Sequence, residues 1–114
     1  MGVYETATKL ASEIKISKEY KSFKKSMDEV QKDKSSEELL KTYRSIQIEI
    51  QNYMVKNQQI DKKNQRRIEG IQQRVSNNKI VSNYLINEQK LNRLMENINK
   101  ILAQAIENDY RRKR

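Results

Sequence analysis

The sequence contains no cysteine, no histidine and no proline. Without cysteine the chain can form no disulfide and cannot hold an iron-sulfur cluster through thiolates. Without histidine and cysteine it also lacks the commonest general bases, nucleophiles and transition-metal ligands. We therefore expect no catalytic centre, no metal site and no cofactor, and we predict that the protein is not an enzyme.

Glycine and long apolar runs are also scarce. Gly2 and Gly70 are the only glycines among 114 residues, so no glycine-rich phosphate-binding loop exists. No apolar run approaches the ~20 residues that span a bilayer, and the first residues lack the apolar core of a signal peptide. We expect no membrane span and a cytoplasmic location.

The residues that dominate the chain are Lys, Glu, Gln, Asn, Ile and Leu, and only 35% of the sequence is hydrophobic. This composition favours helices joined by short turns. It predicts an all-α fold, namely an elongated antiparallel bundle of about five helices with a long C-terminal helix. Because the core of one chain would be thin, we also expect self-association, with a homodimer as the predicted assembly.

Apolar residues spaced by three and four place the five helices along the chain. We expect helices at residues 3–15, from Ser17 to about Val30, and at 35–57, 61–76 and 79–109. Ser17, Ser35 or Ser36, and Asp61 are the candidate N-caps. Residues 1–110 then form one helical domain, and 111–114 form a basic tail. The third helix is predicted to bury Leu39, Leu40, Tyr43, Ile46, Ile50, Tyr53 and Met54.

The fifth helix carries the most regular apolar stripe, but a glutamate, Glu88, occupies one of its positions. The apolar members of this stripe are Val81, Tyr84, Leu91, Met95, Ile98, Leu102 and Ala105. A buried and unpaired carboxylate would be very costly, so Glu88 must reach water, a cation or a hydrogen-bond donor. One hypothesis places it inside a helix interface, where polar groups fix register and partner choice. The other shifts the seam to Leu85, Leu91 and Leu94 and leaves Glu88 at its solvated edge. The candidate interface residues are Glu88, Gln89, Leu91, Asn92, Met95 and Ile98.

The formal net charge is +9, of which the tail at 111–114 supplies four, and the most basic helix is the fourth. Lys62 with Arg66 and Lys63 with Arg67 are spaced to form a double ridge of cations, which suits phosphates. The same ridge is also what a solvated helix face in a lysine-rich chain looks like. The candidate nucleic-acid contacts are Lys62, Lys63, Arg66, Arg67, Arg74, Arg111 and Arg112.

Two further features have a structural and a functional interpretation. Gly70 lies in mid-helix, where glycine costs ~1 kcal/mol relative to alanine. It marks either a close approach of another helix, a hinge, or a tolerated surface position. The tyrosines on apolar stripes are expected to pack in the core rather than to stack on bases, and they are Tyr20, Tyr43, Tyr53 and Tyr84.

The order and spacing of residues along the whole chain form a recognisable pattern. Its most specific part is YLINEQKLNRLMENINKI, from Tyr84 to Ile101. The other positions of the pattern are Tyr4, Ala7, Leu10, Ile14, Ser17, Glu19, Tyr20, Asp33, Tyr43, Gln47 and Gln51. With these residues the chain resembles, over residues 4–108, the YlbF/YmcA family of small helical bacterial proteins, and especially its YheA-like branch.

The resemblance implies an all-helical fold and a regulatory, non-enzymatic role. Better-studied members of the family act in a complex linked to ribonuclease Y, messenger RNA processing, competence, sporulation and biofilm formation. A ribonuclease complex is therefore an expected protein partner. Some members are associated with iron-sulfur clusters held by cysteines, and this property does not carry over to a chain without cysteine.

Overall fold

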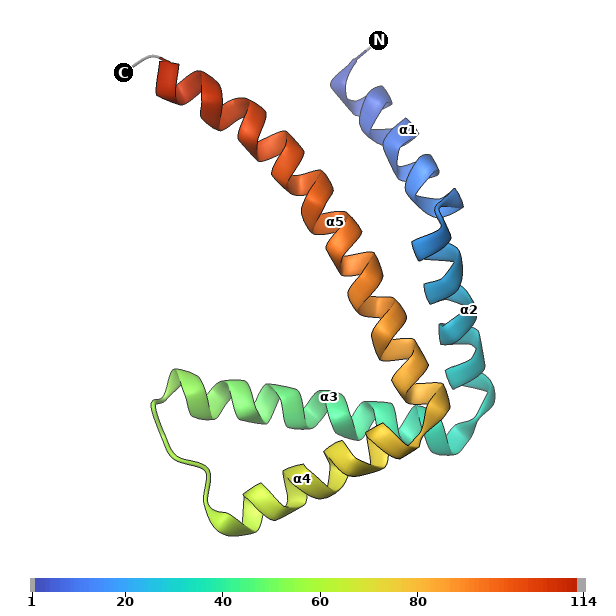
Figure 1. Cartoon of the computed structure of the whole chain (residues 1–114), viewed down its shortest axis with the longest axis vertical. Helices are drawn as coiled ribbons and strands as arrows, with labels where there is room; N and C mark the ends of the chain where they lie inside the picture. The colour runs from blue at the N-terminus through green and yellow to red at the C-terminus, as the bar shows by residue number, and fades with distance from the viewer. Residues whose placement is uncertain (1, 113–114) are drawn as a thin grey trace. The chain divides into compact units, whose positions relative to one another are not determined.

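A computed structural model describes residues 2–112, and this part of the chain consists of five α-helices without a strand (Figure 1). The helices are α1 (Val3–Ile16), α2 (Lys18–Lys32), α3 (Lys34–Val55), α4 (Lys62–Asn77) and α5 (Lys79–Arg112). The predicted all-α class is confirmed, and so is the long C-terminal helix, since α5 has 34 residues.

The described residues divide into two compact units. The first, which we call the terminal unit, contains residues 2–24 and 86–112. The second, which we call the hairpin unit, is Lys25–Leu85. Both α2 and α5 therefore contribute their two ends to different units.

Ser17 ends α1 and begins α2, as the sequence predicts. Its backbone is extended, and its hydroxyl accepts a hydrogen bond from the Tyr20 N–H at 3.2 Å. The same hydroxyl donates to the Ile14 carbonyl at 2.6 Å. One side chain thus satisfies a free carbonyl at the end of one helix and a free N–H at the start of the next.

The cap of α3 differs from the prediction, because Asp33 rather than Ser35 or Ser36 occupies the N-cap position. Asp33 has an extended backbone, and its carbonyl accepts the Glu37 N–H at 2.9 Å. Ser35 and Ser36 already lie within the first helical turn. Ser36 then turns its hydroxyl back and donates to Oδ2 of Asp33.

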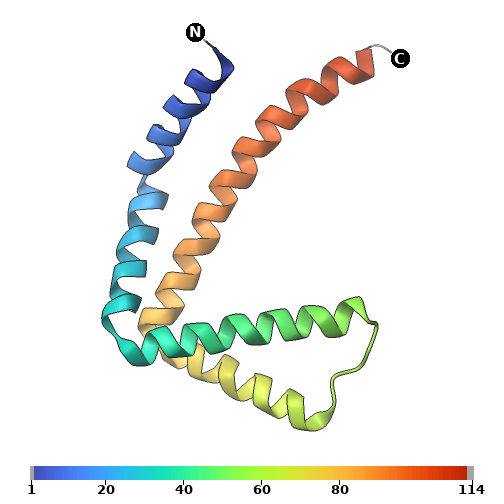
Figure 2. The same cartoon turned by 180° about the vertical axis from the view of Figure 1, so that it is seen from behind.

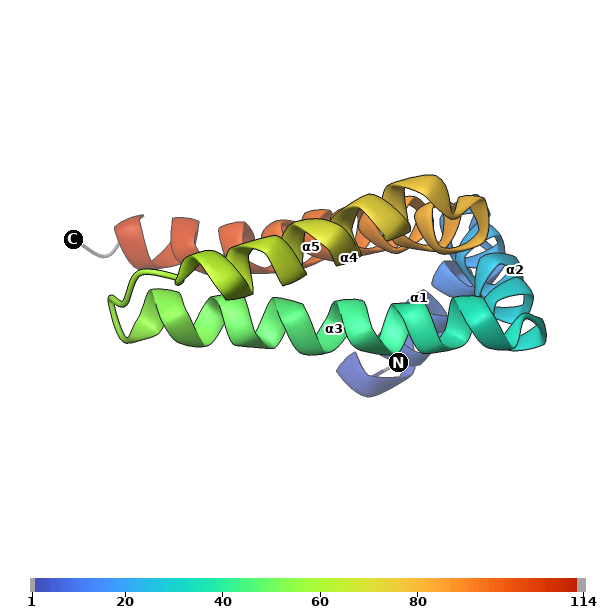
Figure 3. The ribbon, with the colours of Figure 1, turned by 90° about the horizontal axis from the view of Figure 1, so that it is seen from below.

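The core of the hairpin unit lies between α3, α4 and the first turns of α5. Figure 3 shows α3 and α4 side by side, and α3 packs along α4. Leu39, Val75 and Val81 form the buried cluster, and Val81 is completely inaccessible to solvent, with 0% exposure. The half-buried residues packed around this cluster are Leu40, Tyr43, Ile71 and Leu85.

The far end of the hairpin is polar, which corrects one predicted core position. Met54 is 75% exposed instead of buried. The first turn of α4 begins with the polar residues Lys62, Lys63 and Asn64. Asn57, in the connection between the helices, adopts a positive φ of 54°, which asparagine tolerates better than most residues.

The terminal unit is a layer of two antiparallel helical segments. The segment formed by α1 and the start of α2 runs opposite to α5 in Figure 1 and in Figure 2. The half-buried apolar residues of this unit are Leu10, Ile14, Tyr20, Phe23, Leu91, Leu94 and Ile98. No side chain within residues 2–24 and 86–111 is fully buried. This unit therefore has a seam but no closed core.

Candidate interaction surfaces

The residues that the sequence-based hypotheses single out lie mostly on the surface of the described part of the chain. Within residues 2–112 no three His, Cys, Asp or Glu side chains are grouped so that they could hold a metal ion. No helix in this range is both long enough and apolar enough to cross a bilayer. Binding surfaces are therefore the features to compare with the sequence-based hypotheses.

The predicted interface residues on α5 separate into two groups. Glu88, Leu91 and Ile98 are half-buried within the terminal unit, whereas Gln89 and Asn92 are exposed. Met95 is 38% exposed, at the border between the two groups. Glu88 is not without an interaction partner. Half-burial and an interaction partner at Glu88 agree with both hypotheses for this residue, whereas Gln89 and Asn92 lie on an open face.

The apolar stripes of the terminal unit extend beyond the part in which they cover each other. On α1, Val3 lies on the same helical face as the half-buried Leu10 and Ile14, but it is 82% exposed. On α5, Leu102 continues the face of Leu91 and Ile98, but it is 55% exposed. Each stripe is therefore shielded in its middle and uncovered towards the chain end.

Other large apolar side chains of this unit are also accessible. Ile101, Ile106 and Tyr110 of α5 are 66%, 65% and 73% exposed, and Tyr4 of α1 is 87% exposed. Single exposed apolar residues are normal on a protein surface, whereas a group of them is a candidate interaction surface. Periodicity identified the stripes, but it could not show that they are uncovered.

Sequence analysis also missed a shallow polar depression in the terminal unit, with a volume of about 370 Å³. Lys18, Glu19 and Ser22 contribute to it from the start of α2. From α5 it is lined by Asn87, Lys90, Arg93, Leu94 and Asn97. No local motif indicates it, because it requires the antiparallel arrangement of two distant segments.

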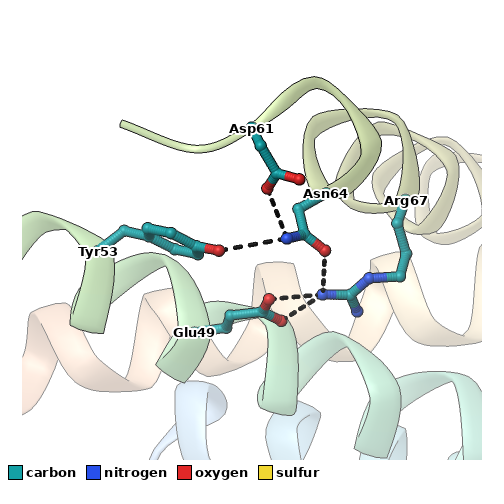
Figure 4. Close-up of polar contacts among 5 residues, drawn as sticks. All are labelled: Glu49, Tyr53, Asp61, Asn64 and Arg67. Atoms are coloured by element: carbon teal, nitrogen blue, oxygen red, sulfur yellow. Dashed lines mark hydrogen bonds and ion pairs between the residues drawn. The ribbon is translucent and has the colours of Figure 1, made fainter. Parts of the chain in front are cut away.

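The cations of α4 do not form the predicted double ridge. Lys62, Lys63, Arg66 and Arg74 are exposed and make no hydrogen bond or ion pair in residues 2–112. Arg67, by contrast, turns towards α3 and binds the carboxylate of Glu49 (Figure 4). This pairing removes Arg67 from the free cations, since a carboxylate on the neighbouring helix neutralises it.

Asn64 connects this ion pair to the start of α4. Its amide donates to Asp61 at 2.6 Å and to the Tyr53 hydroxyl at 3.2 Å, as Figure 4 shows. Its carbonyl oxygen accepts from Arg67 at 3.5 Å. Asp61 does occupy the predicted N-cap position of α4, but its carboxylate binds this side chain instead of a backbone N–H. The network fixes the open end of the hairpin.

A second polar network joins the two turns at the other end of the hairpin unit. Ser36 is 0% exposed, and its hydroxyl accepts a hydrogen bond from Asn78 Nδ2 at 3.1 Å. The Asn78 side-chain oxygen accepts the Val81 N–H at 3.0 Å, so Asn78 caps α5. Asn83 also donates across the unit to the buried Ser26 at 3.2 Å. None of these contacts was predicted.

The tyrosines are arranged as expected for core and seam positions. Tyr84 is buried, with 8% exposure, and Tyr20, Tyr43 and Tyr53 are half-buried. The guanidinium of Arg44 lies 5.9 Å from the centre of the Tyr84 ring, within cation–π range. These rings are therefore committed to packing within the chain.

The predicted basic tail is only partly described. Arg111 is exposed and belongs to the last turn of α5, which continues to Arg112 and so extends beyond the predicted end at residue 109. Lys113 and Arg114 lie outside the described residues.

Comparison with known proteins gives a consistent result over almost the whole chain. The sequence profile described as "Control of competence regulator ComK, YlbF/YmcA" matches residues 3–107. A UPF0342 protein of Clostridium novyi is 30% identical over 110 residues, which cover 96% of both chains. A UPF0342 protein of Halothermothrix orenii is 30% identical over 107 residues, covering 94% of this chain and 91% of the relative.

A solved structure shares the fold. It is a protein of unknown function (DUF964) from Bacillus stearothermophilus, with a TM-score of 0.78, 16% sequence identity and 96% coverage of each chain. Neither the family description nor the names of these relatives describe an enzyme. With a profile match over residues 3–107 and relatives of 30% identity along nearly their full length, the chain belongs to the YlbF/YmcA family.

Proposed function

We propose that this protein is a non-enzymatic regulator that acts in the cytoplasm through protein–protein contacts, and that it does so as a homodimer. The observation that carries the proposal is the terminal unit, which has apolar stripes and no fully buried side chain within residues 2–24 and 86–111. The description of the family, control of the competence regulator ComK, supports a regulatory role.

We assign the uncovered stripes to a second copy of the chain. The stripe of Leu91, Ile98 and Leu102 is half-buried in its first part and open at Leu102, so a second antiparallel pair can continue the same packing. The exposed apolar groups on α5 that would join this interface are Met95, Ile101, Leu102, Ile106 and Tyr110. With Val3 and Tyr4 of α1, they offer on the order of 800 Å², which is what each partner buries in a standard interface.

The regulatory partner of such a dimer is, by family resemblance, a complex that contains a ribonuclease. Gln89 and Asn92 support this assignment, because they leave an exposed polar face on α5 beside the apolar stripe. A polar rim beside an apolar centre is the usual composition of an interface between soluble proteins. The candidate interface residues on α5 thus serve self-association at Met95 and Ile98 and partner contact at Gln89 and Asn92.

The test of self-association uses sedimentation equilibrium at micromolar protein. We expect the parent chain to sediment as a dimer of the 13.6 kDa protomer and the variant Leu102→Gln/Ile106→Gln to sediment as a monomer. Both positions are exposed in the single chain, so glutamine should leave the protomer fold intact. The matched control is Ile48→Gln/Val55→Gln, which removes two exposed apolar groups from α3. A monomeric parent, or a control that dissociates equally, would contradict the assignment.

The partner is tested separately with the tagged protein expressed in its own cells. The ribonuclease subunit is quantified in the recovered material by its own antibody, for the parent and for Gln89→Ala/Asn92→Ala. We expect the ribonuclease to be recovered with the parent and its recovery to fall at least tenfold with the variant, because the variant lacks both polar contacts to the partner. Both side chains are exposed, so their truncation should not unfold the chain. Absence of the ribonuclease from the parent sample would remove this partner while leaving the dimer untouched.

A further inference from the structure

We propose that the outer face of α4 binds the sugar-phosphate backbone of a nucleic acid. This site is separate from the protein contacts proposed above, and it lies entirely within the hairpin unit. The face is defined by Lys62, Lys63, Arg66, Gly70 and Arg74, all of which are exposed. The opposite face of α4 carries Ile68, Ile71 and Val75, which face into the hairpin unit and leave the basic face open.

The first argument is the unbalanced charge of this face. Four cations lie on it without any ion pair or hydrogen bond in residues 2–112, and Glu69 is the single carboxylate of α4. Arg67 differs from these four cations, because it donates to both carboxylate oxygens of Glu49 and so has a structural partner within the chain. The other four cations have no such partner and are free to meet an external polyanion.

The second argument is the position of two of these cations on the helix. Lys62 and Lys63 begin α4, and its first turn contains no acidic residue. The N-terminus of a helix carries the positive end of the macrodipole, so cations there are unfavourable for folding. Asp61 at the N-cap is the one carboxylate directly beside them, and Asn64 binds it, so the two lysines have no ion-pair partner of their own within residues 2–112. An approaching phosphate would be attracted by both lysines and by the dipole.

Gly70 supplies the third argument. A Cβ built on this residue would meet nothing within 4 Å, and its φ is not positive, so neither packing nor backbone geometry requires glycine. In mid-helix it lowers helix stability relative to alanine. It lies between Arg66 and Arg74, where the missing side chain lets a backbone approach the helix closely. From Lys62 to Arg74 the face is about 18 Å long, enough for several successive phosphates.

The composition of the face decides between a nucleic acid and an acidic protein. A protein interface normally has an aromatic or aliphatic anchor at its centre, whereas the outer face of α4 has none. Its remaining members are Gln73 and Asn77, which are also exposed. Long cationic and amide side chains without an apolar anchor are typical of contacts to phosphate and sugar.

The test measures fluorescence anisotropy of labelled 20-nucleotide single-stranded RNA and DNA with the full-length protein between 50 and 200 mM salt. Four phosphate contacts predict that the logarithm of the affinity falls with the logarithm of the salt concentration with a slope of about −2.8. The variant Lys62→Gln/Lys63→Gln/Arg66→Gln should have a slope shallower by about 2. A preference for RNA would show that the face distinguishes the two sugars, and equal binding would show that it contacts either backbone. Both results support the site.

The matched control is Lys21→Gln/Lys24→Gln/Lys25→Gln, which removes three exposed, unpaired lysines from α2. It should retain the slope of the parent if the α4 face is the site. Equal losses in both triple variants, or equal binding of poly-glutamate by the parent, would overturn the proposal in favour of generic polyanion attraction. Circular dichroism melts of both triple variants verify that they fold. If a triple variant does not fold, the single variant Arg66→Gln repeats the test, and its slope should be shallower than that of the parent by about 0.7.

Discussion

Arg67 on α4 and Glu49 on α3 form a forked ion pair that joins the two arms of the hairpin. One guanidinium nitrogen of Arg67 donates to both carboxylate oxygens of Glu49, at 2.6 Å and 2.5 Å. The two side chains are 47% and 33% exposed, so water competes with each of them for the other. We conclude that the pair orients the hairpin more than it stabilises the fold.

A double-mutant cycle with Arg67→Gln and Glu49→Gln tests this conclusion. We expect a coupling energy of about 0.2 to 1 kcal/mol, because the pair is partly exposed, and a smaller value in 1 M salt. The cycle is measured by urea unfolding followed by circular dichroism. Arg66→Gln is the control, since Arg66 is unpaired and should show no coupling to Glu49. A coupling well above 2 kcal/mol that persists in salt would contradict the assignment.

Ser36→Ala should destabilise the hairpin unit by roughly 1 to 3 kcal/mol. The Ser36 hydroxyl is inaccessible to solvent and binds both Asp33 and Asn78, so alanine would leave a half-buried amide and a half-buried carboxylate without this partner. The free energy of unfolding is measured by urea titration. Ser35→Ala is the matched control, because Ser35 is exposed on the same turn and should change stability by less than ~0.5 kcal/mol. Equal effects of the two changes would refute the role given to Ser36.

Gly70→Ala should stabilise the protein by about 0.5 to 1 kcal/mol. The added Cβ enters open space, and alanine restricts the unfolded chain and favours the helix. The midpoint of urea unfolding at low protein concentration is the measurement. A decrease in stability would mean that the outer face of α4 is already in contact with something in the free protein.

Local spacing explains why so much of the helical architecture could be predicted. Ser17 caps α2 through a residue three positions further on, and Asp61 stands directly before α4. Such signals lie within one helical turn, so they need no knowledge of the tertiary fold. Local signals also explain why the cap of α3 was predicted at the wrong residue. Asp33 and Ser36 are both good capping residues within one turn, and the sequence does not rank them.

The polar contacts across the hairpin could not be predicted in this way. Asn78 lies 42 residues from Ser36, and Arg67 lies 18 residues from Glu49. Both contacts depend on how α3 and α4 are aligned, which helical periodicity does not determine. The ridge assigned to Lys63 and Arg67 was therefore wrong at Arg67, whose side chain follows a carboxylate on the neighbouring helix instead of its own row.

The exposure of residues along the apolar stripes also depends on the tertiary fold and could not be predicted from periodicity. Periodicity identifies the apolar face of a helix, but it does not reveal how far a neighbour covers that face. Met54 and Leu102 both lie on predicted apolar stripes, and they are 75% and 55% exposed. At Met54 the neighbouring turn of α4 is polar. At Leu102 the described residues leave more than half of the side chain exposed, which is why this position becomes a candidate interface.

Glu88→Leu decides between the two hypotheses for the glutamate within the stripe of α5. Glu88 is half-buried and has a partner, and it shares its side of the helix with Met95 and Leu102. We expect the free energy of unfolding to change by less than ~1 kcal/mol. The loss of a partly exposed polar contact costs about as much as the added apolar burial contributes. Thermal melts at matched protein concentration and sedimentation of both variants are the measurements, and Gln89→Leu on the adjacent exposed position is the control. An unchanged mass would place Glu88 at the solvated edge of the seam, whereas a loss of 1 to 3 kcal/mol or an altered mass would show that its carboxylate fixes the register of an interface.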